Sequence, residues 1–114
     1  YKLITNKKGI PEKQTFDYIV QNVKDFLQQV RAHNSKAKII WTYGMIKLDI
    51  VPVCLKKGIE LYKKETCDKD VYLLLLDSMD KLEKNDSMKG SRGHPGPVTH
   101  KSAAEKIISF IKKI

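Results

Sequence analysis

Residues 71–76 read VYLLLL, an uninterrupted apolar run that a polar turn precedes and Asp77 ends. A short run of this kind is typical of a strand that is buried on both faces in a parallel sheet. Residues 38–43, KIIWTY, form a second run rich in β-branched and aromatic side chains, which Gly44 closes. We therefore predict strands at 38–43 and 71–76, and a short third strand at 1–6.

Helical patterns alternate with these strands. Apolar side chains recur at three- and four-residue steps over residues 12–34, the spacing of one face of an amphipathic helix. A second helix is expected over about 48–65, with Pro52 in its first turn, where proline is tolerated. A last helix is expected over 100–111. The connection at 77–99 holds three of the six glycines, and we predict no regular structure in it.

The alternation of strands and helices predicts the α/β class, with a three-layer, flavodoxin-like parallel sheet flanked by helices. A chain of 114 residues has the size of one small domain or of part of a larger one. Three strands are few, because sheets of this type have roughly five and need cover on both faces. We expect residues 1–114 to be the C-terminal portion of a single domain, incomplete at its N-terminus. A missing N-terminal segment or a second copy of the chain would complete the sheet.

The charge is strongly basic, with 22 Lys and Arg against 13 Asp and Glu and a formal net charge of +9. Only Arg31 and Arg92 are arginines, and the lysines are spread along the chain. Nucleic-acid sites rely on arginine and on aromatic side chains beside the basic residues, so we interpret the lysines as solvated helix surface and expect no nucleic-acid partner. No apolar run approaches the roughly 18 residues of a membrane span, and we expect no membrane partner.

Other chemistry has weak support in the sequence. Cys54 and Cys67 stand thirteen positions apart with no CxxC pattern, so a disulfide and two free thiols both remain open. The glycines form no phosphate-binding pattern, and we expect no cofactor. An acidic cluster lacks calcium-loop spacing, so we expect no metal and interpret it as solvated loop; its members are Asp77, Asp80, Glu83 and Asp86.

The long connection is the best candidate for chemistry. A loop of more than about 20 residues without regular structure is uncommon unless it has a function. His94 lies there between glycines and prolines just before a helix, a position suited to a general base. Tyr43, nearest the end of its strand, lies where parallel sheets place their sites.

Residues 90–113, GSRGHPGPVTHKSAAEKIISFIKK, resemble the C-terminal block of the SGNH/GDSL hydrolase superfamily, and in particular of its acetylxylan-esterase-like carbohydrate esterases. In that family a catalytic histidine in a His-Pro-x-x-x-x-His context leads into the last helix; here these are His94 and His100. The segments AKIIWTYGM and VYLLLLD are similar to two of its strands. Thr5-Asn6 keeps two positions of the family's Gly-Thr-Asn-Asp block. The resemblance covers the whole chain but only the second half of a family member.

This resemblance implies roles for particular residues. His94 would be the general base, and Asn6 would be the oxyanion-hole asparagine. Tyr43 and Arg92 are the candidate substrate-binding residues. The family's acid three positions before the histidine is replaced by Ser91, but some esterases resembling this chain use a Ser–His dyad with backbone carbonyls orienting the ring. The nucleophilic Gly-Asp-Ser block is absent, so the chain is not expected to be active alone.

Three classes of function stay open on the sequence. The first is part of a serine esterase that acts on an acetylated carbohydrate or another small ester. The second is a degenerate, non-catalytic relative that binds a glycan or a protein, which Ile4, Lys7 and Ser91 favour because they replace family residues. The third is a basic module that binds polyanions, and it rests on net charge alone.

Overall fold

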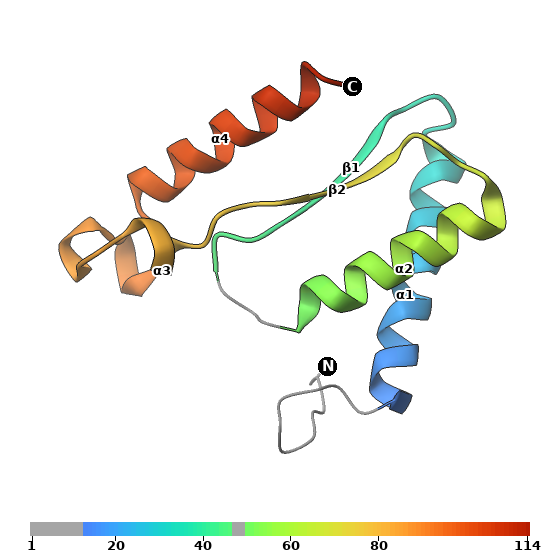
Figure 1. Ribbon diagram of the computed structural model, residues 1–114, viewed down its shortest axis with the longest axis horizontal. Coiled ribbons are helices and arrows are strands. Elements are labelled where there is room, and N and C mark those ends of the chain that lie inside the picture. Colours follow the sequence, from blue (N-terminus) through green and yellow to red (C-terminus); the bar gives the residue numbers. More distant parts are fainter. Residues whose placement is uncertain (1–12, 47–49) are drawn as a thin grey trace. The chain divides into compact units, whose positions relative to one another are not determined.

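A computed structural model describes residues 13–46 and 50–114, which form helices and a small two-stranded sheet (Figure 1). The elements are α1 (Lys13–His33), β1 (Ile39–Tyr43), α2 (Val51–Thr66), β2 (Val71–Leu75), α3 (Met79–Leu82) and α4 (Pro97–Ile111), with 3₁₀ turns at Asp86–Met88 and Ser91–Gly93. The chain divides into two compact units. One contains α1, α2 and the first parts of both strands, and the other contains the strand ends, α3 and α4.

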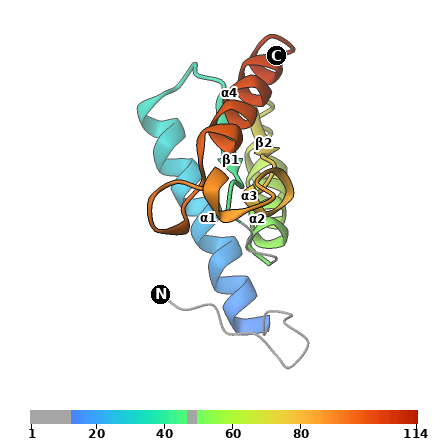
Figure 2. The same cartoon turned by 90° about the vertical axis from the view of Figure 1, so that its left-hand side faces the viewer.

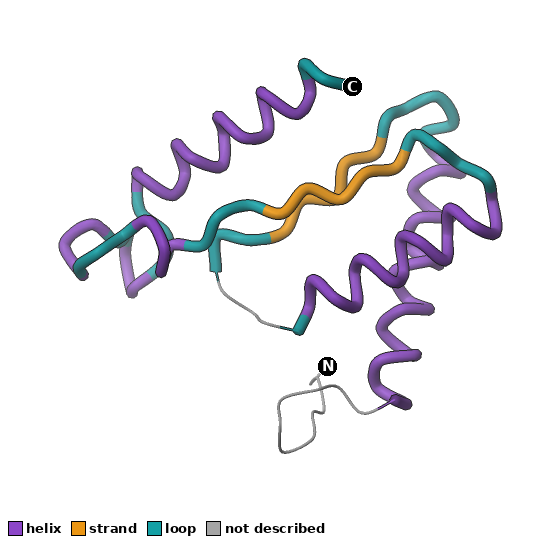
Figure 3. The backbone as a smooth tube through the Cα atoms, viewed as in Figure 1, coloured by secondary structure: helices purple, strands orange, loops and turns teal. Residues whose placement is uncertain are grey.

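The two strands are paired in parallel. At one end the Ile39 N–H donates to the Asp70 carbonyl oxygen at 2.8 Å, and at the other the Leu76 N–H donates to the Tyr43 carbonyl oxygen at 2.7 Å. Both partners advance together along the chain, and Figure 3 shows the strands running side by side. The predicted α/β class with parallel strands is confirmed. The predicted strand at 1–6 lies outside the described residues.

The core of the first unit lies between α1 and α2, which Figures 1 and 2 show next to each other. The buried apolar side chains are Val20, Val23 and Leu27 of α1 and Cys54, Leu55, Ile59 and Tyr62 of α2. Gly58 makes the close approach possible, because a Cβ there would lie 2.5 Å from the Cβ of Val23. Pro52 stands in the first turn of α2, as predicted, where its missing N–H breaks no helical hydrogen bond.

Two expectations were wrong. β2 is not buried along its whole length, since Leu75 is 43% exposed. Residues 77–99 are also not without regular structure, because they contain α3, both 3₁₀ turns and the first turn of α4. α4 begins at Pro97, since the fixed φ of proline suits the first helical position.

The cysteines form no disulfide: Cys54 is buried, Cys67 is exposed, and both are free. Across residues 13–46 and 50–114, no helix has both the length and the apolar character that crossing a bilayer requires. Nor do the described side chains gather three or more potential metal ligands at one place. Trp41 of β1 is half-buried and packs edge-on against Phe26 of α1, with ring centroids 5.5 Å apart.

Candidate active site

The loop that carries His94 is folded tightly on itself. The Gly90 N–H donates to the His94 carbonyl oxygen at 2.8 Å, so the segments before and after the Ser91–Gly93 turn are joined. A Cβ on Gly96 would lie 2.0 Å from the Met88 carbonyl oxygen. Real Cβ atoms do not approach a backbone oxygen this closely. Glycine is therefore needed at position 96, where the chain crosses the Met88 carbonyl.

His94 has a defined ring orientation at the end of the Ser91–Gly93 turn. Arg92 (φ 57°) and Gly93 (φ 72°) both adopt the left-handed conformation, which reverses the chain. Nδ1 of His94 then lies 2.9 Å from the Ser91 carbonyl oxygen. A carbonyl only accepts hydrogen bonds, so Nδ1 carries the proton in this arrangement. Nε2 is therefore the acceptor nitrogen of the neutral ring, on an exposed side chain.

Glu83, just after α3, holds the far side of this loop. Its side chain is buried at 4% exposure, and Oε2 accepts hydrogen bonds from the Gly96 N–H at 2.6 Å and from the Thr99 hydroxyl at 2.5 Å. The Thr99 hydrogen bond lowers the pKa of Glu83 against the opposite effect of burial, and N–H groups of Gly96 and Thr99 and the charge of Lys89 lower it further. Oε1 is buried without a hydrogen-bond partner.

The interpretation of the acidic cluster as solvated loop is thus wrong for Glu83, although Asp80 and Asp86 are exposed. The N-cap residue of α4, Gly96, has no side chain to cap the helix. Glu83 supplies the acceptor instead, from thirteen positions upstream. No sequence pattern marks such a long-range cap, so the sequence could not have revealed this residue.

The other predicted site residues have different surroundings. Asn6 lies outside the described residues. Tyr43 is half-buried on β1, and its hydroxyl is buried with no hydrogen bond, so burial raises its pKa. Arg92 is exposed beside His94 in the chain, and His100 is exposed on the first turn of α4. The structure brings together His94 and the Ser91 main chain, and no hydrogen bond joins Tyr43 to His94 in the part of the chain that is described.

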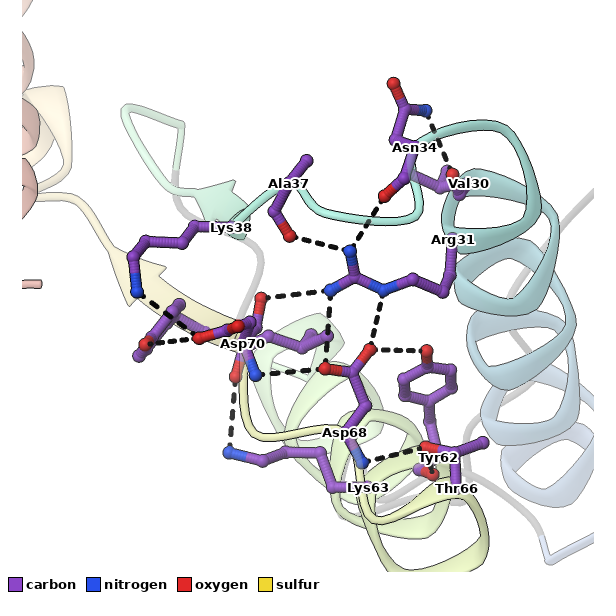
Figure 4. A network of polar contacts seen from close by, with 12 residues as sticks. Val30, Arg31, Asn34, Ala37, Lys38, Tyr62, Lys63, Thr66, Asp68 and Asp70 are labelled. Atoms are coloured by element: carbon purple, nitrogen blue, oxygen red, sulfur yellow. Dashed lines mark hydrogen bonds and ion pairs between the residues drawn. The ribbon is translucent and has the colours of Figure 1, made fainter.

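A second polar network lies in the other unit, where α1 and α2 meet the start of β2 (Figure 4). Arg31 donates through Nε and Nη2 to the two carboxylate oxygens of Asp68, at 2.8 and 3.3 Å. Its remaining hydrogen bonds go to the carbonyl oxygens of Asn34, Ala37 and Asp70. The Tyr62 hydroxyl also donates to Asp68, at 2.7 Å.

An open pocket of about 430 Å³ adjoins this network and is lined by Gln28, Arg31, Ala32, Tyr62, Thr66 and Asp68. A guanidinium has five N–H donors, and Arg31 makes five hydrogen bonds within the chain. The one arginine in the pocket therefore has no donor left for an anionic ligand. We assign this network to structure and not to binding.

Comparison with solved structures shows that the chain is similar to part of a carbohydrate esterase. One matching structure is that of an acetyl xylan esterase, Est2A, from the rumen bacterium Butyrivibrio proteoclasticus, with a TM-score of 0.85 and 32% sequence identity. The match covers 99% of this chain, and the chain spans 29% of the length of that esterase. No protein-family model and no curated protein matches the chain. The likeness supports a relationship with carbohydrate esterases.

Proposed function

We propose that residues 1–114 form the C-terminal portion of an SGNH-type serine esterase that removes acetyl groups from carbohydrates, with His94 as its general base. The similarity to an acetyl xylan esterase over 99% of the chain supports the substrate class. The observation that carries the role of His94 is the contact of its Nδ1 with the Ser91 carbonyl oxygen at 2.9 Å. The rest of the longer protein would complete the sheet and supply the serine.

The main-chain carbonyl takes the place of the carboxylate that usually orients a catalytic histidine. With Nδ1 protonated and held by Ser91, Nε2 can accept the proton of a serine hydroxyl as its oxygen attacks the acetyl carbonyl carbon. The imidazolium then gives this proton to the departing sugar oxygen, which leaves an acetyl-enzyme. In the second half, Nε2 takes a proton from water, the water oxygen attacks the acetyl carbon, and acetic acid leaves as Nε2 returns its proton to the serine oxygen.

Two further roles belong to this proposal. The side-chain amide of Asn6 would donate a hydrogen bond to the oxyanion that develops on the acetyl oxygen. Arg92 is exposed two residues before His94 and would contact the hydroxyls or ring oxygens of the sugar. Tyr43 contributes through its ring, because its hydroxyl is buried.

The test uses the longer gene product in which residues 1–114 follow a Gly-Asp-Ser block, assayed on acetylated xylan and on p-nitrophenyl acetate. We expect His94→Ala to reduce turnover by at least about 10²-fold, the usual contribution of a general base. His100→Ala is the matched control, an exposed histidine in the same segment, and should keep most of the parent rate. Residues 1–114 alone should show no turnover.

Two outcomes would overturn the proposal. Hydrolysis at the parent rate by the His94→Ala enzyme would show that His94 is not the general base. A gene without any upstream serine block would instead favour the non-catalytic relative, and glycan binding without hydrolysis would then be the expected activity.

A further inference from the structure

Glu83 is a buried carboxylate that no step of the proposed reaction uses. It lies at the end of α3, and its side chain is only 4% exposed. A buried carboxylate is unfavourable unless its oxygens are hydrogen-bonded, so its partners indicate what it does for the fold. Both described partners, Gly96 and Thr99, lie within five positions after His94 in the sequence.

The contacts of Glu83 fasten the segment that follows His94. Gly96 is the N-cap residue of α4 and Thr99 lies in the first turn, so one oxygen of Glu83 holds the start of the helix at two points. The partial positive charge of a helix N-terminus strengthens this contact as long as the carboxylate is ionised. Residues 84–95 are thereby closed into a loop with both ends fixed.

Within this closed loop His94 cannot move independently. The Gly90 N–H holds the His94 carbonyl oxygen at 2.8 Å, and Gly96 is seated directly against the Met88 carbonyl. The ring contact with Ser91 spans only three residues, and Gly96, which Glu83 holds, lies two positions after His94. The backbone that carries the His94 ring is therefore held on both sides, by Gly90 before it and by the start of α4 after it.

We propose that Glu83 is a positioning residue for His94: it fixes the start of α4 and so keeps the Nδ1 proton of His94 on the Ser91 carbonyl. The proposal rests on the proposed function for its catalytic meaning. Gly96 and Thr99 are neutral partners of Glu83. The charge of Lys89 also lowers the pKa of Glu83. The ionised carboxylate is therefore the form that holds the loop.

The primary experiment needs no esterase activity. Long-range ¹H–¹⁵N NMR spectra at pH 8 of the longer protein, with its histidines labelled, distinguish the Nδ1–H from the Nε2–H tautomer of each imidazole. We expect His94 to be mainly Nδ1–H, whereas the exposed His33 and His100 show the mixture of a free ring. Glu83→Gln keeps the size of the side chain but removes its charge, and it should move His94 at least halfway to the free-ring mixture.

Two further variants make this result specific. Thr99→Val removes one donor to Glu83 and should produce a smaller shift in the same direction. Glu105→Gln is the matched control, because Glu105 lies on α4 with a side chain 67% exposed and an ion pair to Lys101 at 3.9 Å. It should leave the His94 tautomer unchanged. Amide signals from α4, as well as from α1 and α2, show in every variant whether both units of the chain are folded.

An unchanged His94 tautomer in folded Glu83→Gln would overturn the proposal, and so would a free-ring mixture at His94 in the parent chain. Unfolding of both Glu83→Gln and Thr99→Val would also overturn it, because Glu83 would then support the whole fold. In the longer enzyme, Glu83→Gln should lower kcat about tenfold with little change in KM. Full activity of the His94→Ala enzyme would refute the proposed function and leave the tautomer result standing, so the two failures are distinguishable.

Discussion

Asp68 and Glu83 are both carboxylates with a lowered pKa, but they lie in different units of the chain and have different hydrogen-bond partners. Asp68 faces a guanidinium, and burial alone would raise its pKa, which hydrogen bonds from Arg31 and Tyr62 lower overall. The hydrogen bonds that Glu83 accepts come from the neutral groups of Gly96 and Thr99. Arg31 has no donor left for a ligand, whereas the loop held by Glu83 leaves Nε2 of His94 as an acceptor. A polar network is best judged by the donors and acceptors that it leaves unused.

The largest expected effect is on the Arg31 network. Arg31→Met should cause the greatest loss in the free energy of unfolding among these variants, because it leaves Asp68 and three carbonyl oxygens without their shared donor. Urea denaturation followed by circular dichroism measures this loss. Lys38→Met is the control, since its ion pair with Asp70 spans 3.3 Å between side chains about half exposed, and it should change little. Equal losses for both variants would contradict the structural role of Arg31.

The next effect concerns the crossing of the loop in the other unit. Gly96→Ala places a Cβ against the Met88 carbonyl and should destabilise the chain by about 1–3 kcal/mol. Gly93→Ala is the matched control, because its Cβ would meet no atom within 4 Å and only its φ of 72° is unfavourable. We expect about 1–2 kcal/mol there. Hydrogen exchange at Gly90 should increase more for Gly96→Ala, and the reverse order would count against the crossing.

Acid should weaken both networks. The pKa of Asp68 and that of Glu83 are lowered in the folded chain, so the unfolded chain binds more protons as the pH falls. Their stabilisation is complete above the ordinary carboxyl values of about 4 and is lost as the pH falls through the folded values. The free energy of unfolding should therefore decrease from pH 6 to pH 3. Asp68→Asn and Glu83→Gln should each flatten this slope, above a background from Asp77, whose pKa is also lowered. If the free energy of unfolding depended on pH in both variants as it does in the parent chain, Asp68 and Glu83 would not be the groups that titrate.

The smallest effects compare two tyrosines. Tyr62→Phe removes a hydroxyl that donates to Asp68 at 2.7 Å and should destabilise the chain by about 1–2 kcal/mol. Tyr43→Phe removes a buried hydroxyl that has no partner, so it should be neutral or stabilising. Thermal unfolding of the two variants side by side measures the difference. A marked loss of stability in Tyr43→Phe would show that the Tyr43 hydroxyl has a hydrogen-bond partner in solution.

The sequence predicted the elements whose signals are local. The three- and four-residue spacing located α1, and the apolar runs located β1 and β2 to within a residue or so at each end. Pro52 lies in the first turn of α2, as predicted, but α2 begins at Val51 and not at about residue 48. The same signal at Pro97 was missed, because apolar spacing appears only from Ala103 onward. α3 is too short to carry a helical period.

The candidate site was less predictable, since its contacts join residues without a pattern between them. The position of His94 before a helix followed from the sequence, and the resemblance implied that a carbonyl orients its ring. That this carbonyl belongs to Ser91 depends on the left-handed conformation of Arg92, a residue type that does not favour it. The role of Glu83 depends on a fold that closes a loop of twelve residues, and composition cannot reveal it.

The Ser91 carbonyl has a consequence for the inheritance of this site. A carboxylate partner of a catalytic histidine can be lost by a single codon change, but every amino acid carries a main-chain carbonyl. Codon 91 can therefore drift without deleting the acceptor, as long as the turn keeps its shape. Under the proposed function, selection on ring orientation would fall on Gly93, with its φ of 72°, and on Gly96, which packs against the Met88 carbonyl. Descendants of such a gene would be recognised by the spacing of these glycines around the histidine, and a search for an acidic residue at position 91 would miss them.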